Sequence, residues 1–208
     1  MHVFLETERL VLRRFTATDV DHLVDLDSDP EVMRYLNGGR PTPRETIQQI
    51  ILPAFLSYYE PHPGLGVFAA IEKRSGEFLG LFGFRPKDAV NRNDVVPPGE
   101  VALGYRLRRV AWGKGYATEG ARALIRKGFT ELGVQRVVAT IYRDNLPSCR
   151  VMEKVGLSLV RTNGKRVAEP GASDATSPNF SEVLGDGDKI EYELIKADWE
   201  QQKAASGE

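Results

Sequence analysis

EVALGYRLRRVAWGKGYATEGA, residues 100–121, joins a strand-like segment to a helix-like segment through a short loop that holds two glycines. The alternating apolar residues of 100–107 predict a strand, and a helical pattern follows the loop. Gly113 and Gly115 flank Lys114 where that helix begins. Backbone N–H groups at a helix start lack a helical acceptor and lie at the positive end of the helix dipole. The stretch therefore predicts an anion site, because glycines allow close approach to the main chain and Lys114 adds charge.

The same two glycines could instead serve only as a tight turn before the helix. The loop lacks the GxxxxGK[ST] pattern of a P-loop, and it lacks the third glycine of the dinucleotide-binding fingerprint. On these residues alone, anion binding and a purely structural turn both stay open.

The rest of the chain alternates between strand and helix patterns, which predicts one α/β domain spanning residues 1–208 with the element order βααβββαβαββ. The predicted strands are 9–15, 66–73, 78–84, 100–107, 136–142, 157–162 and 189–195. One predicted helix begins near Thr16, and the others cover 42–59, 117–132 and 146–156. Residues 164–189 are rich in Gly, Pro, Ala, Ser and Asp, which predicts a long irregular loop.

Single residues predict the ends and breaks of these helices. Thr42 is the expected N-cap of the second helix, with Pro43 at the first helical position and Glu45 completing a capping box. Pro53 is expected to kink or divide that helix. Gly133 is the expected C-cap of the helix that follows the glycine loop.

Composition excludes several classes of protein. Lysine and arginine number 28 against 29 acidic residues, so no global charge favours a nucleic-acid or membrane partner. Cys149 is the single cysteine, which excludes an internal disulfide and a cysteine-based zinc cluster. The three histidines have no metal-site spacing. No signal-like or membrane-spanning apolar run is present, so we expect a cytoplasmic protein.

Residues 100–121 also resemble the acyl-CoA pyrophosphate signature of the GNAT superfamily of N-acyltransferases. In that signature Gln or Arg is followed by xxGxG/A, and the slots here hold Trp112, Gly115 and Ala117. The form WGxGYATEA is similar to the branch that contains the ribosomal-protein N-terminal alanine and serine acetyltransferases.

Two further segments carry the resemblance. DNLPSCRVMEKVGL (144–157) is similar to the second signature of that branch, NxxSxxVxEKxGF, and LETERLVLRRF (5–15) is similar to its N-terminal strand. The resemblance covers nearly the whole chain except the loop at 164–189. It implies a GNAT-like mixed, mostly antiparallel central sheet, flanked by helices, that splays between two parallel strands, 100–107 and 136–142.

The resemblance further implies an N-acetyltransferase with acetyl-CoA as co-substrate and no metal. Backbone amides of the glycine loop would hold the pyrophosphate. The backbone near Leu107 would pair with the pantetheine arm like an added strand, and Asn145 would hydrogen-bond that arm from the facing strand end. The implied cofactor-binding residues are Leu107, Trp112, Gly113, Lys114, Gly115, Tyr116, Ala117, Thr118, Asn145 and Ser148.

The implied reaction is direct attack of a neutral amine on the thioester, for which the enzyme needs no nucleophile. A backbone N–H near residue 107 would stabilise the oxyanion. Ser148 would lie near the sulfur and act as the acid for the departing thiolate. Glu100 is the candidate base, with a solvated carboxylate as the alternative, and Val160 stands where the branch often has glutamate. Arg109 replaces a usual proline, and it would either help to hold phosphate or be solvated.

Other functions and the acceptor stay open at this point. A catalytically inactive CoA-binding module and a phosphate- or nucleotide-binding domain of another type are the alternatives to an acetyltransferase. The acceptor would be a protein N-terminus or a small amine, and a homodimer is a possible assembly. DVDHLVDLDSD (19–29) could be an acidic patch for a polycationic acceptor or an ordinary solvated helix face. The tyrosines that either line an acceptor pocket or pack in the core are Tyr35, Tyr58, Tyr59 and Tyr105.

Overall fold

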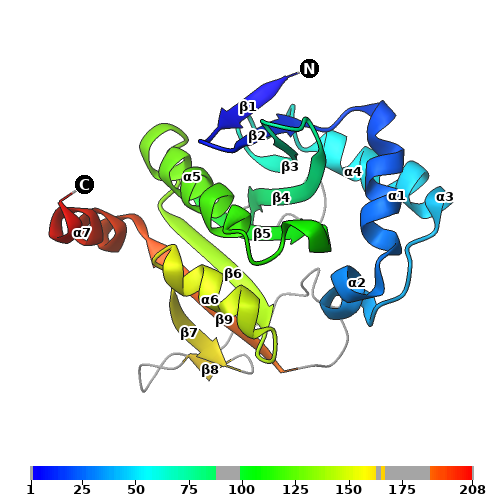
Figure 1. The fold of residues 1–208 in the computed structure, drawn as a ribbon. Helices are drawn as coiled ribbons and strands as arrows, with labels where there is room; N and C mark the ends of the chain where they lie inside the picture. Colours follow the sequence, from blue (N-terminus) through cyan, green and yellow to red (C-terminus); the bar gives the residue numbers. More distant parts are fainter. Residues whose placement is uncertain (1, 88–98, 163–164, 167–187, 208) are drawn as a thin grey trace.

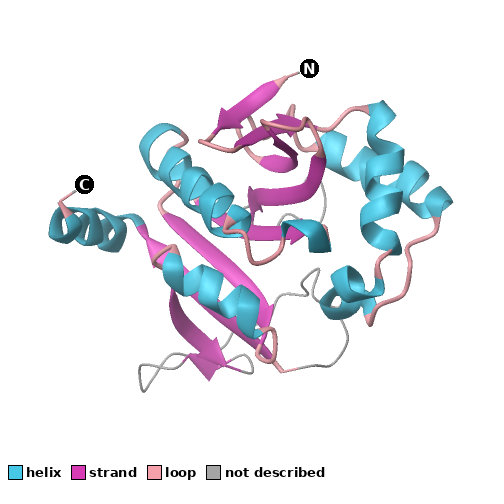
Figure 2. Ribbon diagram, viewed as in Figure 1, coloured by secondary structure: helices cyan, strands magenta, loops and turns pink. Residues whose placement is uncertain are grey.

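The computed structural model describes residues 2–87, 99–162, 165–166 and 188–207, which form a mixed sheet with helices on both of its faces (Figure 1 and Figure 2). The described strands form one nine-stranded sheet in the order β1-β2-β3-β4-β5-β6-β9-β7-β8. The strands are β1 (Val3–Glu6), β2 (Leu10–Arg14), β3 (Gly66–Glu72), β4 (Phe78–Pro86), β5 (Glu100–Leu107), β6 (Arg136–Tyr142), β7 (Ser158–Thr162), β8 (Lys165–Arg166) and β9 (Lys189–Ile195). The helical segments are η1 (Ala17–Asp19), α1 (Val20–Ser28), α2 (Pro30–Asn37), α3 (Arg44–Thr46), η2 (Ile47–Ile51), α4 (Leu52–Ser57), η3 (Arg109–Ala111), α5 (Tyr116–Glu131), α6 (Leu146–Lys154) and α7 (Lys196–Ser206).

The predicted α/β class and the mostly antiparallel sheet are confirmed, since β5 and β6 form the one parallel pair among the described strands. The structure adds elements that the sequence patterns did not predict, namely β1, α2, β8 and α7. Helix α7 escaped prediction because it has little apolar periodicity, and Trp199 is the residue that packs it against Phe129, with ring centroids 5.3 Å apart. The loop predicted over 164–189 lies outside the described residues except at 165–166 and 188–189.

Alternating side chains of the sheet bury against helices on opposite faces. On β3, Phe68 and Ala70 belong to the core beneath α5 and α6, whereas Val67 and Ala69 belong to the core beneath α1, η2 and α4. Gly120 lets α5 approach the sheet closely, because a side-chain carbon at this position would collide with Phe82. Close packing of α5 matters for function, since this helix begins at the glycine loop.

The helical segment 44–57 differs from its prediction at its start, whereas the expected break at Pro53 is present between η2 and α4. Pro43 is the N-cap and no side chain caps the helix, so the expected capping box of Thr42 with Glu45 is wrong. Thr42 lies beside α1 instead, where its backbone N–H donates to the carbonyl of Asp27 at 3.3 Å. Just before Pro53 the chain takes a π-helical turn, which accommodates a residue without an N–H while the helix continues.

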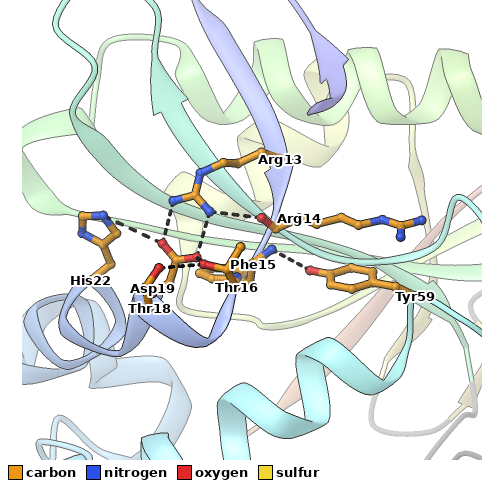
Figure 3. Close-up of polar contacts among 8 residues, drawn as sticks. All are labelled: Arg13, Arg14, Phe15, Thr16, Thr18, Asp19, His22 and Tyr59. Atoms are coloured by element: carbon orange, nitrogen blue, oxygen red, sulfur yellow. Dashed lines mark hydrogen bonds and ion pairs between the residues drawn. The ribbon is translucent and has the colours of Figure 1, made fainter. Parts of the chain in front are cut away.

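A buried ion pair fixes the corner between β2 and η1 (Figure 3). Arg13 donates through both terminal nitrogens to the carboxylate of Asp19, at 2.8 and 2.6 Å, and the backbone N–H of Thr16 donates to the same carboxylate at 2.7 Å. Burial alone would raise the pKa of Asp19, but these hydrogen bonds hold it below its usual value. The helix predicted near Thr16 therefore begins at that residue, with Asp19 closing the turn.

Tyr59 ties the end of α4 to two strands in the same region (Figure 3). Its hydroxyl accepts the backbone N–H of Phe15 at 2.9 Å and donates to the carbonyl of Val67. Burial raises the pKa of Tyr59 to about 12. The prediction that Tyr59 packs in the core is therefore correct, and its hydroxyl is committed to the backbone.

Tyr59→Phe is expected to lower the free energy of unfolding by about 1–3 kcal/mol at neutral pH, because a buried N–H and a buried carbonyl lose their shared partner. The raised pKa gives a second signature. The folded state retains the Tyr59 proton longer than the unfolded state does, so the parent loses stability as pH rises from about 10, the usual tyrosine value, through about 12. Urea unfolding of both proteins across this range measures both effects. Equal stability at neutral pH would contradict the assignment.

None of the helices in the described part of the chain combines the length and apolar character that a membrane span requires.

Candidate active site

The parallel strands β5 and β6 separate after three residue pairs. Their ladder joins Glu100 to Arg136, Val101 to Val137 and Ala102 to Val138, whereas β5 stays paired with β4 as far as Leu107. The expected splay between 100–107 and 136–142 is thus present, and it opens toward the C-terminal ends of both strands.

The main chain of Leu107 faces this opening. The N–H of Arg108 donates to the carbonyl of Leu79 on β4 at 2.8 Å, which places the backbone groups of residues 104, 106 and 108 on the β4 side. Backbone groups of an antiparallel pair alternate between the two edges of a strand. The N–H and carbonyl of Leu107 therefore point away from β4, toward the edge that β6 has left.

The glycine loop follows directly and ends at an uncapped helix. Gly113 and Gly115 both have left-handed backbones, with φ of 71° and 84°, and Gly115 is the N-cap of α5. The first intrahelical bond runs from the backbone N–H of Glu119 to the carbonyl of Gly115 at 3.0 Å, and no side chain caps the helix. The N–H groups of the first helical turn therefore lack a helical acceptor, at the positive end of a 16-residue helix.

Two other helices, α2 and α6, have a capping side chain at this position. Asp29 caps α2 by accepting the N–H of Glu31 at 3.0 Å, and Asn145 caps α6 by accepting the N–H of Ser148 at 3.4 Å. The bare start of α5 fits an external anion such as a diphosphate, because its amides and its dipole both favour negative charge.

Some side chains of the loop are free to contact a ligand, and others are hydrogen-bonded within the protein. Lys114 is exposed and Thr118 is half-buried, so both can reach a ligand at the helix start. Tyr116 is buried with its hydroxyl bonded to Glu72, which leaves only its backbone amide for a ligand. Trp112 keeps an exposed ring and donates its indole N–H to the carbonyl of Leu107 at 2.7 Å. This bond uses one of the two lone pairs of that carbonyl.

Helix α6 forms the other side of the opening, because it begins just after β6. The hydroxyl of Ser148 lies 3.1 Å from the hydroxyl of Tyr105 on β5, so the pair spans the two diverging strands. The ring of Tyr105 is half-buried and packs near Phe82 at the edge of the core, while its hydroxyl lies at the opening. Burial is the main cause that raises the pKa of Tyr105, so it carries its proton at neutral pH. The hydroxyl contact was missed, although Tyr105 lies two residues before Leu107 and so shares its face of the strand.

Glu100 lies at the closed end of the splay. Its carboxylate accepts a hydrogen bond from Arg136 at 2.8 Å. Seven residues of strand separate it from Leu107, which corresponds to about 23 Å. The structure therefore brings Leu107, Gly115 and Ser148 to one opening but does not bring Glu100 there.

The acidic segment 19–29 is largely neutralised within the chain. Four of its five aspartates form ion pairs: Asp19 with Arg13, Asp21 with Arg44, Asp27 with Arg106, and Asp29 with Arg109. Burial raises the pKa of Asp27 despite its arginine partner. Asp25 is the one left without an ion pair among the described residues. The exposed residues Asp21, Asp25 and Ser28 agree with a solvated helix face, and the ion pairs leave little free charge for an acidic patch.

Helix α2 contacts the chain on both sides of the opening. At its start, Arg109 of η3 donates to Asp29 at 2.6 Å, so Arg109 is ion-paired within the protein. Farther along the helix, the hydroxyl of Tyr35 donates to the carbonyl of Asp144 at 3.3 Å. These two bonds connect α2 to the segments that follow β5 and β6, which places the helix beside the mouth of the splay. Within the described ranges no group of three or more His, Cys, Asp or Glu could hold a metal ion.

Comparisons with known proteins agree with this geometry. Residues 9–158 match the family model of the acetyltransferase (GNAT) domain. The chain is 34% identical to an uncharacterised N-acetyltransferase, p20, of Bacillus licheniformis over 73% of this chain and 80% of that protein. It is 29% identical to the FsC-acetyl coenzyme A-N(2)-transacetylase of Aspergillus fumigatus over 94% of this chain and 77% of that protein.

A solved structure shares the fold. The aminoglycoside acetyltransferase AAC(6′)-Ib, crystallised with ribostamycin and coenzyme A, superposes with a TM-score of 0.68 at 20% identity, covering 94% of this chain and 98% of that one. The splayed parallel pair, the uncapped start of α5 and the match over most of the sequence lead to one conclusion. This chain belongs to the GNAT acetyltransferase family.

Proposed function

We propose that this protein transfers the acetyl group of acetyl-CoA to a primary amine, either a protein N-terminus or a small molecule, by direct attack of the amine on the thioester. The observation that carries the proposal is the convergence at one opening of an uncapped helix start, an outward-facing strand edge and a hydroxyl pair. The family supplies the acetyl-CoA dependence.

The glycine loop is the proposed diphosphate site. The amides of residues 113–118 and the dipole of α5 stabilise the negative charge, and Lys114 adds a cation. The carbonyl of Leu107 accepts a hydrogen bond from an amide N–H of the pantetheine arm, as the carbonyl of a strand neighbour would. Asn145 can contribute from the facing side, because its amide nitrogen makes no hydrogen bond within the described part of the chain.

Acetyl-CoA supplies the acetyl group as a thioester whose thiolate is a moderate leaving group. The chain contributes orientation, and the N–H of Leu107 stabilises negative charge on the carbonyl oxygen. Ser148 gives a proton to the sulfur and regains one from solvent, and the N-terminal end of α6 favours the charge that develops at the sulfur. The hydroxyl of Tyr105 holds that of Ser148 in place, since the two lie within hydrogen-bond distance. The amine loses its proton to water.

Glu100→Gln is expected to leave the pH dependence of turnover unchanged, because the carboxylate lies at the closed end of the splay and is paired with Arg136. The loss of a partly buried ion pair should lower stability by about 1 kcal/mol or less. A pH–rate profile of parent and variant, with a urea unfolding curve for each, measures both. Loss of the acidic limb in the variant would restore Glu100 as the general base.

The proposed function is tested by thiol release from acetyl-CoA across a panel of N-terminal peptides, polyamines, amino acids and aminoglycosides. We expect at least one primary amine to release thiol in proportion to acetylated product. Tight coenzyme A binding without release for any amine would indicate an inactive binding module. Protection against unfolding by ATP or NAD, but not by coenzyme A, would indicate a different phosphate site.

A further inference from the structure

The loop between β1 and β2 grips the first turn of α5 through a network of hydrogen bonds. Arg9 donates from Nε to Oε2 of Glu119 at 2.6 Å, and its backbone N–H donates to Oε1 at 2.9 Å. The hydroxyl of Thr7 donates to the same Oε1 at 2.5 Å. One terminal nitrogen of Arg9, Nη1, donates to the backbone carbonyl of Lys114 at 2.9 Å. One arginine thus joins the helix to the loop that precedes it.

From this geometry we infer that Arg9 is a positioning residue for the diphosphate-binding loop, which it orients by holding the carbonyl of Lys114. The inference rests on the proposed cofactor site. It adds to that site a residue about 105 positions away in sequence that touches the loop from its outer side.

The carbonyl of Lys114 determines the direction of the next amide. In a trans peptide the carbonyl and the following N–H point in opposite directions. When Arg9 holds that carbonyl, the N–H of Gly115 must point away from Arg9, and no negative carbonyl oxygen turns toward the ligand. The approach is close, because a side-chain carbon at Gly115 would lie 3.3 Å from Nη2 of Arg9.

The guanidinium is itself held on several sides. It stacks over the ring of Tyr116, with 4.4 Å to the centroid, and pairs with Glu119 through Nη2 at 2.6 Å. This arrangement needs the planar fork of arginine, which a lysine ammonium cannot reproduce.

The negative charge of Glu119 requires its hydrogen bonds to Thr7 and Arg9. Burial by itself would raise the pKa of Glu119, but hydrogen bonds from Thr7 and Arg9 hold it below its usual value, so the carboxylate is charged at neutral pH. Without Arg9 that charge would stand uncompensated in the first turns of α5, where it would repel a diphosphate.

Arg9→Lys separates a positioning role from a simple charge contact. The variant keeps the positive charge but loses the fork, and we expect it to weaken coenzyme A binding about tenfold in calorimetry. The KM for acetyl-CoA should rise by a similar factor, while kcat at saturating acetyl-CoA changes less than about twofold. Arg126→Lys is the matched control on the exposed face of α5, since its guanidinium makes no side-chain bond within the described part of the chain.

Thr7→Val tests the hydrogen-bond network around Glu119 without changing any charge. Loss of its bond to Glu119 should weaken coenzyme A binding about two- to threefold, and it serves where an Arg9 variant fails to fold. Parental affinity and KM in a folded Arg9→Lys protein would overturn the inference, because charge alone would then suffice. Failure of the parent to bind coenzyme A would instead overturn the proposed function.

Discussion

Gly115→Val is expected to weaken coenzyme A binding by about 100-fold or more. Gly115 has a φ of 84°, and a β-branched residue in this left-handed region is strained by about 1–3 kcal/mol. Relaxing the strain would rotate the peptide groups whose amides face the ligand. The first carbon of the new side chain would also lie 3.3 Å from Nη2 of Arg9, which would disturb the contacts by which Arg9 holds the loop. Together these costs correspond to the stated loss of affinity, which titration calorimetry with coenzyme A measures.

Gly76→Val supplies the matched control for backbone strain. Gly76 lies in the turn between β3 and β4 with a φ of 72°, and a side-chain carbon there would meet nothing within 4 Å. This variant should lose stability to a similar degree but bind coenzyme A with parental affinity. If Gly115→Val, folded by circular dichroism, retained parental affinity, the diphosphate could not lie at this loop.

Ser148→Ala is expected to lower kcat about 100-fold while the affinity for coenzyme A changes less than about twofold. General acid catalysis contributes about 10²–10⁴ to rate, and a thiolate needs less help than an amine or alkoxide would, so the lower value is appropriate. Steady-state kinetics with a responsive amine and calorimetry with coenzyme A measure the two quantities. An unchanged kcat would remove Ser148 from the mechanism.

Tyr105→Phe completes a double-mutant cycle around Ser148. Alone it should reduce kcat about tenfold, because the serine hydroxyl loses its orienting partner. The double variant should be no slower than Ser148→Ala, since the two hydroxyls act as one unit. Ser57→Ala is the control, because that hydroxyl donates only to the carbonyl of Ala54 in α4. Additive losses would show that Tyr105 acts independently of Ser148.

Much of the fold could be predicted from sequence because strand and helix periods are local properties. The predicted strands at 100–107, 136–142 and 189–195 match β5, β6 and β9 residue for residue. Elements failed to be predicted where the local signal is weak. Strand β1 has four residues, and α7 buries little beyond Trp199.

The candidate site could be predicted where its chemistry lies in the backbone. Gly113 and Gly115 indicate a turn before a helix, and in the structure both glycines have left-handed backbones. Side-chain roles were harder to predict, as Glu100 shows. Its position at a strand end says nothing about which end of the splay it occupies, and the parallel register with β6 decides that.

The sequence by itself determined the order of the strongly patterned elements, the sheet class and the loop that begins α5, since these depend on residues that are neighbours along the chain. Only the tertiary structure decided which charges are free and which hydroxyls meet. Tyr105 and Ser148 are 43 residues apart, Asp29 and Arg109 are 80 apart, and Arg9 and Glu119 are 110 apart. Such pairs form when packing brings distant elements together, and no local pattern encodes which elements meet.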